Sequence, residues 1–385
     1  METDTRPIQA TRPERNAQLD GLRGYAAFVV AIYHVITGTE PSLIARILPV
    51  TIQSLRDGYD LILKVVLLMV SGETAVVIFF VLSGVVLFKS LAADRTPFLT
   101  MSYQFVVRRL FRIYPAMLVC LIACALLFPL AGIAVTWETF IRNALLIQFH
   151  LNGATWTLAV EFLAIPLFLA AALSFRRFGE WGLVGLLLLI WLATRKPVAT
   201  AVLHLQLTQV HWFAFALGML IPTRIGERAA RVLPLAALPI FFICMLLARH
   251  VVEGPNTGLK LLQWSAAFVV LMLYYGKSGA FGRFLEWPIS QFLGRISYSF
   301  YLFNVLFLEV ICHFLRGQPW VAGRPLEVGL LASVVVIALT LPVSYLSARF
   351  VEEPAIRAGR AFLKHKWFRR AGEEAASREA AATNR

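Results

Sequence analysis

One histidine lies deep inside the first apolar segment of the chain, where an ionisable side chain is costly. The segment runs from Gln18 to His34, and Arg23 stands at its polar start. In a helix the steps from Arg23 to His34 cover about 16 Å, which places His34 near the centre of a hydrocarbon layer about 30 Å thick. Ionisable groups at that depth usually face protein or water and serve a function. Because imidazole transfers protons near neutral pH, we predict that His34 is a general base. The alternative is a histidine that only packs against a neighbouring helix.

A carboxylate at comparable depth is the expected partner of His34. Glu161 lies in another apolar segment, about 9 Å below the outer membrane surface, and His34 lies about 14 Å below the same surface. A carboxylate beside an imidazole holds it in one tautomer, so we expect Glu161 to orient His34. A structural bond from Glu161 to a hydroxyl or to a backbone break is the alternative. A second intramembrane histidine, His211, has no recognisable motif around it.

Membrane-spanning helices must position these groups. The chain is 59% hydrophobic and 15% charged, with a mean hydropathy of +0.72, which excludes an ordinary soluble domain. We predict an all-α, polytopic integral membrane protein with about ten transmembrane helices. The expected spans are 24–38, 75–91, 113–132, 155–173, 181–194, 203–221, 232–248, 259–276, 296–315 and 327–348. Segment 61–70 is too short to cross alone, so it is either an interfacial helix or the lead-in to the second span.

The distribution of positive charge predicts the orientation. With the N-terminus in the cytoplasm, 26 of the 36 Lys and Arg residues fall in cytoplasmic stretches. The positive-inside rule then favours both termini in the cytoplasm. We expect a cytoplasmic segment 1–17, a transmembrane domain 18–360 whose first span is an uncleaved anchor, and a cytoplasmic tail 361–385. The basic residues are spread over the turns between spans, so the net charge of +14 indicates topology and contact with lipid headgroups, and no nucleic acid partner.

The cysteines give no sign of a metal site. All four lie inside apolar spans and are expected to pack there: Cys120, Cys124, Cys244 and Cys312. Cys120 and Cys124 share a helical face, but no nearby His or acid completes a ligand set, so we expect no metal. His150, in the outer stretch 133–154, is expected to be solvated, with contact to an acceptor as the alternative.

Six local patterns follow one another in a fixed order along the spans. They are Arg23–x10–His34, Phe79–Gly84, Arg108–Pro115, Trp156–Glu161, Gly294–Asn304 and Arg349–Pro354. Each is weak alone, but the ordered set resembles the acyltransferase-3 family of bacterial membrane acyltransferases over residues 18–357. The resemblance implies a multi-pass enzyme of the bacterial inner membrane. Such an enzyme moves an acyl group, expected to be acetyl, from cytoplasmic acyl-CoA to a hydroxyl of a glycan or other acceptor on the outer side.

The resemblance also implies a donor site. Arginine suits bidentate contacts to the phosphates of acyl-CoA, so Arg23, Arg109 and Arg112 are expected to frame a mouth for this donor. Arg108 is expected to be an ordinary membrane anchor. At Glu161 only one carboxylate is available, because Phe162 stands where the family often carries a second acid.

Two residues of the Gly294–Asn304 motif are expected to contact substrate, namely Tyr301 and Asn304. Related chains commonly carry His where this one has Asn304, which can hydrogen-bond but cannot accept a proton in the working pH range.

Two further motifs are expected to be structural. The Ser83–Gly84 end of its motif should approach a neighbouring helix closely, and Ser83 is not expected to be a nucleophile because no His or acid lies near it in sequence. The run Glu352-Glu353-Pro354 is expected to stop a helix and to pair with the basic turns.

The main alternative function is a proton-coupled transporter or flippase in which His34, Glu161 and His211 form a relay. The sequence shows no inverted repeat with matching broken spans, which favours the enzyme. Direct transfer with His34 as base and transfer through an acyl-His34 intermediate both stay open.

Overall fold

Every regular element that the computed structural model describes is helical, within residues 16–50, 52–193, 206–251 and 255–364. Seven stretches of this part of the chain are long and apolar enough to cross a membrane. They comprise α1 (Ala17–Thr39), α3 (Gly58–Met69) with α4 (Gly72–Ala93), α5 (Phe98–Leu130), α7 (Thr155–Leu163) with α8 (Ile165–Phe178), α14 (Pro255–Tyr274), α16 (Pro288–Leu315), and α18 (Pro325–Ser347) with a π-helical turn (Ala348–Glu352) and α19 (Glu353–Lys364). The molecule is therefore a multi-pass, all-α membrane protein, as the sequence predicts.

The count of about ten spans is only partly reproduced. Each predicted span overlaps a helix, but the spans 113–132 and 259–276 extend two residues beyond theirs, 232–248 includes the non-helical residues 233–236, and residues 194 and 203–205 lie outside the described part. Three of these helices are too short to cross alone, namely α9 (Glu180–Ala193), α11 (Gln206–Leu220) and α13 (Ala237–Val251). α13 follows α12 (Arg224–Val232) after a bend of 108°, and the bent pair would make an eighth span.

Segment 39–74 is a folded cap at one end of the bundle. It contains α2 (Ser42–Arg46), a short 3-10 turn (Ile52–Ser54) and α3, and only Val70 and Ser71 separate α3 from α4. Segment 61–70 is thus the lead-in to the second span. The Lys64 ammonium is buried and donates to the backbone oxygens of Ile47 (3.0 Å) and Leu48 (2.8 Å). We call residues 42–69 the α2–α3 cap.

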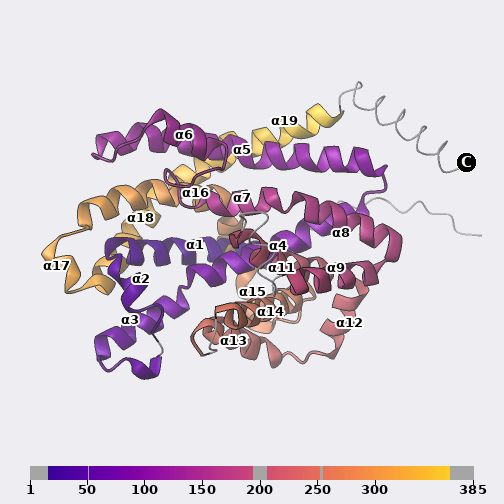
Figure 1. Ribbon diagram of the computed structural model, residues 1–385, viewed down its shortest axis with the longest axis horizontal. Coiled ribbons are helices and arrows are strands. Elements are labelled where there is room, and N and C mark those ends of the chain that lie inside the picture. The colour runs from indigo at the N-terminus through magenta and orange to yellow at the C-terminus, as the bar shows by residue number, and fades with distance from the viewer. Residues whose placement is uncertain (1–15, 51, 194–205, 252–254, 365–385) are drawn as a thin grey trace, which may run out of the picture.

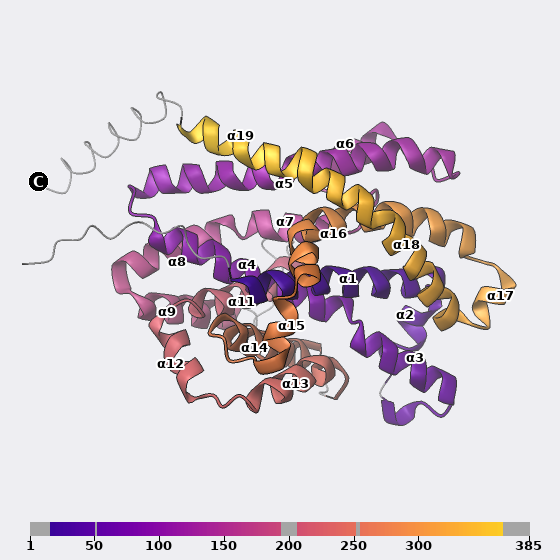
Figure 2. The same ribbon diagram turned by 180° about the vertical axis from the view of Figure 1, so that it is seen from behind.

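The two ends of the bundle differ in what they carry (Figure 1). The α2–α3 cap, α6 (Trp137–Ala144) and α17 (Pro319–Ala322) lie at one end, which we call the α6 end. The α4–α5 loop, the α8–α9 turn and α12 lie at the other, the α12 end. α5 runs between the two ends, and α19 packs along it (Figure 2).

Glycines bring the central helices into close contact. A Cβ on Gly24 of α1 would lie 2.6 Å from the backbone nitrogen of Gly294 of α16, so these helices touch through their backbones. A Cβ on Gly84 of α4 would meet the backbone oxygen of Phe215 in α11, and a Cβ on Gly218 would meet that of Val81. The predicted close approach at the Ser83–Gly84 motif is therefore confirmed, and it follows the general use of small residues between membrane helices.

The predicted helix stop at Glu352–Pro354 is wrong. The chain passes from α18 through the π-helical turn into α19, and Pro354 is the second residue of α19. Proline has no N–H to donate, and it stands just after the π-helical turn, where the i to i−4 hydrogen-bond pattern is already interrupted. Residues 361–364 of the predicted tail belong to α19, and residues 365–385 lie outside the described part.

Three cysteines are fully buried in apolar clusters, as predicted: Cys120, Cys124 and Cys312. Cys244 is half-buried in α13. α15 (Gly279–Leu285) packs closely against α1. A Cβ on Gly21 of α1 would meet the backbone oxygen of Leu285.

Candidate functional site

His34 lies on the unbroken helix α1, so the helical spacing from Arg23 holds. Its side chain is exposed, whereas its neighbours Val35 and Ile36 are fully buried. Its ring contacts the edge of the Tyr33 ring, with centroids 5.3 Å apart. Within the described residues no hydrogen bond occupies the imidazole, so its unprotonated ring nitrogen is available to accept a proton, as a general base requires.

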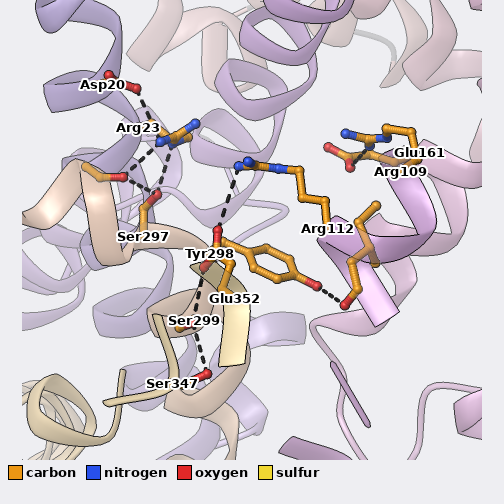
Figure 3. A network of polar contacts seen from close by, with 12 residues as sticks. Asp20, Arg23, Arg109, Arg112, Glu161, Ser297, Tyr298, Ser299, Ser347 and Glu352 are labelled. Atoms are coloured by element: carbon orange, nitrogen blue, oxygen red, sulfur yellow. Dashed lines mark hydrogen bonds and ion pairs between the residues drawn. The ribbon is translucent and has the colours of Figure 1, made fainter. Parts of the chain in front are cut away.

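Glu161 does not pair with His34, which corrects the prediction. Its carboxylate on α7 accepts a hydrogen bond from the Ser83 hydroxyl of α4 (2.9 Å) and forms an ion pair with the Arg109 guanidinium of α5. Within the described residues no hydrogen bond or ion pair joins Glu161 to His34. Figure 3 shows Glu161 beside Arg109.

Glu161 pairs with Arg109 because Arg109 lies deep within helix α5 and is buried. The sequence places Arg109 at the membrane boundary, but α5 begins at Phe98, so Arg109 lies three turns inside the helix with a side chain only 7% exposed. A buried guanidinium requires an anion nearby, and Glu161 is that anion. Ser83, which has no acid near it in sequence, donates to the same carboxylate because the fold brings α4 and α7 together.

A small cavity lies between α4 and α5 near the α12 end. Its volume is about 100 Å³. Apolar side chains and three arginines of α5 line it together; the lining residues are Leu87, Ser90, Leu91, Asp94, Met101, Phe105, Arg108, Arg109 and Arg112. The sequence predicted two of these arginines and treated the third, Arg108, as an anchor.

Arg176 of α8 fixes the α4–α5 loop at the edge of this cavity. Its guanidinium donates to the backbone oxygens of Asp94 (2.7 Å) and Thr96 (3.0 Å). The Asp94 carboxylate in turn accepts from the Thr96 amide and hydroxyl, so it is occupied within the loop. Sequence reasoning missed Arg176 because its partners are backbone groups some eighty positions away.

Arg112 reaches from the cavity toward a second buried carboxylate (Figure 3). Its nearest guanidinium nitrogen lies 4.0 Å from a carboxylate oxygen of Glu352 in the π-helical turn. The other Glu352 oxygen accepts from the Ser299 hydroxyl of α16 (3.3 Å), which also contacts Ser347 (3.1 Å). The predicted pairing of this acidic run with a basic turn is thus confirmed for Glu352.

Arg23 is held at the start of α16 and does not line the cavity. Its guanidinium donates to the Gly294 backbone oxygen (2.9 Å) and the Ser297 hydroxyl (3.0 Å), and it forms an ion pair with Asp20 at 3.2 Å. The structure therefore brings Arg109 and Arg112 together in one cavity and places Arg23 beside the Gly294–Asn304 motif, on the other side of Arg112 (Figure 3).

Tyr301 and Asn304 lie in the interior on α16. The Tyr301 hydroxyl accepts from the Thr157 hydroxyl of α7 (3.1 Å), and its ring contacts Phe79 edge-on. The Asn304 amide donates to the backbone oxygens of Phe300 and Tyr301, and its own buried Oδ1 has no hydrogen-bond partner within the described residues. Asn304 thus presents one free acceptor. Contact of either residue with substrate stays a prediction.

The remaining histidines stand apart. His211 is buried against the rings of Phe80 and Trp156, with centroids 5.1 and 5.4 Å away, and its Nδ1 has no hydrogen-bond partner in the described part of the chain. His150 is exposed after α6.

A family model described as an acyltransferase domain matches residues 16–349 of the chain. No curated protein and no solved structure matches it. The matched region holds the His34 helix, the three-arginine cavity and the Glu161 ion pair, and it ends just before Glu352. The chain belongs to the acyltransferase-3 family, a family of membrane acyltransferases.

Proposed function

We propose that the protein transfers an acyl group, acetyl in the simplest case, from acyl-CoA to a hydroxyl of a glycan or other acceptor across the bacterial inner membrane. The observation that carries this proposal is the cavity that three arginines line together with apolar side chains. Guanidinium groups bind phosphate bidentately, and apolar walls suit the uncharged part of the donor. The volume of about 100 Å³ accommodates only part of such a donor, so the cavity is assigned to its phosphate end.

The proposed topology follows the positive charge. With both termini in the cytoplasm, the α12 end and its cavity face the cytoplasm, where acyl-CoA is found. The α6 end then faces outward, toward the acceptor. Membrane lipids surround the bundle, and the basic residues of α12 and α19 suit anionic headgroups.

In the proposed reaction the acceptor hydroxyl attacks the thioester carbonyl while His34 accepts the hydroxyl proton. A tetrahedral intermediate forms, the carbon–sulfur bond breaks, and the proton on His34 passes to the leaving thiolate to give free CoA. In the alternative order, the His34 imidazole attacks the thioester carbonyl, and the carbon–sulfur bond breaks to release CoA. The acceptor hydroxyl then attacks the acyl-imidazole, the carbon–nitrogen bond breaks, and the hydroxyl proton passes to the freed imidazole. Tyr301 and Asn304 are proposed to orient the acceptor or the donor carbonyl.

The transporter alternative receives no support from the geometry. It needs a relay through His34, Glu161 and His211, but Glu161 is engaged by Arg109 and Ser83, and His211 is surrounded by aromatic rings. No chain of hydrogen bonds joins the three groups within the described residues.

The test measures acetyl-CoA turnover by purified protein and transfer of labelled acetyl to cell-surface glycans. His34→Ala should abolish transfer while the protein stays folded, because the exposed imidazole makes no hydrogen bond. His313→Ala is the matched control, since His313 is also exposed on a long helix, α16, and should leave transfer unchanged. Ping-pong kinetics would indicate the acyl-histidine route. Failure of the wild-type protein to use any acyl-CoA would refute the proposed function.

A further inference from the structure

Two of the cavity arginines have carboxylate partners on other helices, and the two pairs differ in kind. Arg109 is 7% exposed and contacts Glu161 directly, so its guanidinium is fixed. Arg112 is 39% exposed, and its nearest approach to Glu352 is 4.0 Å, which is longer than a charged hydrogen bond of about 2.7–2.9 Å. Arg112 is therefore the arginine that can exchange its present partner for a ligand in the cavity that it lines.

Glu352 owes its position to the only π-helical turn in the described part of the chain. The turn spans Ala348–Glu352 and directs the Glu352 side chain inward, where it is 8% exposed. Such turns occur frequently at functional sites. Ser299 donates to one carboxylate oxygen, and Arg23 also lies close enough to interact with its charge. Glu352 thus keeps partners of its own when Arg112 moves away.

We propose that Glu352 is a positioning residue that serves as the counter-ion of Arg112 in the unliganded protein, and that a phosphate group of the donor displaces it. This inference deepens the proposed function and rests on it. In the unliganded protein the contact with Glu352 keeps the Arg112 guanidinium from being unpaired beside the membrane interior. Because this contact is long, breaking it costs little free energy. The arriving phosphate offers bidentate, charge-assisted hydrogen bonds in place of a 4.0 Å contact.

The inference predicts that removing the Glu352 charge strengthens donor binding. In Glu352→Gln the amide oxygen still accepts from Ser299, but the Glu352 carboxylate no longer competes for Arg112 or repels the phosphate. We expect the Kd of acetyl-CoA to fall about two- to fivefold, the upper part of the range for a partly exposed ion pair. The KM for donor should fall in parallel with little change in kcat, because Glu352 touches no reacting atom.

The matched control is Glu353→Gln, the same change one residue along. The Glu353 side chain is 54% exposed and pairs with Arg349 at 3.7 Å, away from the cavity. Its substitution should leave the Kd of acetyl-CoA unchanged. Glu352→Asp is the second test variant, because a carboxylate withdrawn by one methylene competes less for Arg112. It should shift the Kd in the same direction by a smaller factor, and it carries the test if Glu352→Gln does not fold.

The experiment is equilibrium binding of radiolabelled acetyl-CoA to the purified full-length protein, with inorganic pyrophosphate as competitor. Tighter binding of both ligands by Glu352→Gln supports the inference, since a variant that is merely destabilised would bind less tightly. Unchanged or weaker binding of acetyl-CoA overturns it, as does a gain for acetyl-CoA without one for pyrophosphate. If the wild-type protein binds no acetyl-CoA, the proposed function fails as well; if it binds and the variants do not differ, only the role of Glu352 fails.

Discussion

Replacement of Glu161 by Gln separates two roles for this carboxylate, as partner of Arg109 or as partner of His34. Glutamine keeps an oxygen that accepts from Ser83, so the hydroxyl stays satisfied. The guanidinium of Arg109, 7% exposed, is then left without its anion. Removal of one partner from a buried ion pair costs about 3–5 kcal/mol. Because the Glu161 side chain is itself 17% exposed, we expect a loss near the lower limit, about 3 kcal/mol in the free energy of unfolding.

The assay is a double-mutant cycle on protein purified in one detergent, with unfolding followed by helical circular dichroism. Arg109→Met alone leaves Glu161 unpaired, and the double variant Arg109→Met/Glu161→Gln removes both charges. The double variant should recover at least about 1 kcal/mol relative to the sum of the single variants, because paired groups are not additive.

His34→Ala provides the second cycle. If Glu161 serves Arg109, the effects of His34→Ala and Glu161→Gln on stability should add to within about 0.5 kcal/mol. A Glu161→Gln protein of wild-type stability, together with strong non-additivity toward His34→Ala, would refute the assignment and restore the His34–Glu161 pair.

Three further perturbations test the packing, the cap and the cavity. Gly218→Val should destabilise the bundle by about 1–3 kcal/mol because its Cβ would meet the Val81 backbone oxygen. Gly185→Val is the control and should be nearly neutral, since a Cβ there meets nothing within 4 Å. Equal melting temperatures of the two variants would contradict this prediction. Lys64→Met leaves two backbone oxygens of the α2–α3 cap without their hydrogen-bond donor, which should destabilise the cap by about 1–3 kcal/mol. An added protease should therefore cut segment 42–57 faster than in wild type. Equal rates of cleavage would mean that the ammonium does not hold the cap. Arg176→Ala removes two hydrogen bonds that hold the α4–α5 loop in place. Losing about 1.5 kcal/mol of the free energy that keeps this loop ordered should raise the KM for the donor about tenfold at unchanged kcat. A fall in kcat alone would argue against a role of Arg176 in the cavity wall.

Local composition and order along the chain were enough for the fold class and the family. Apolar runs predict helices in a membrane because a spanning backbone must satisfy its own hydrogen bonds, and every predicted span overlaps a helix. The number of spans does not follow, since α9, α11 and α13 are apolar but short, and only their packing and the 108° bend after α12 decide how they lie. The close approach at Gly84 was predictable because residue size is a local property.

The partners of the charged side chains were decided by tertiary structure alone. The similar depths expected for Glu161 and His34 suggested that these two side chains meet. The rotation of each helix about its axis and the true start of α5 instead bring Glu161 to Arg109. In the same way, the order of the residues cannot reveal that Arg176 holds a loop, that Arg108 lines a cavity, or that a π-helical turn brings Glu352 to Arg112. An apolar pattern is read from one helix, whereas an ion pair is fixed by the relative rotation of two helices, which only the packed bundle defines.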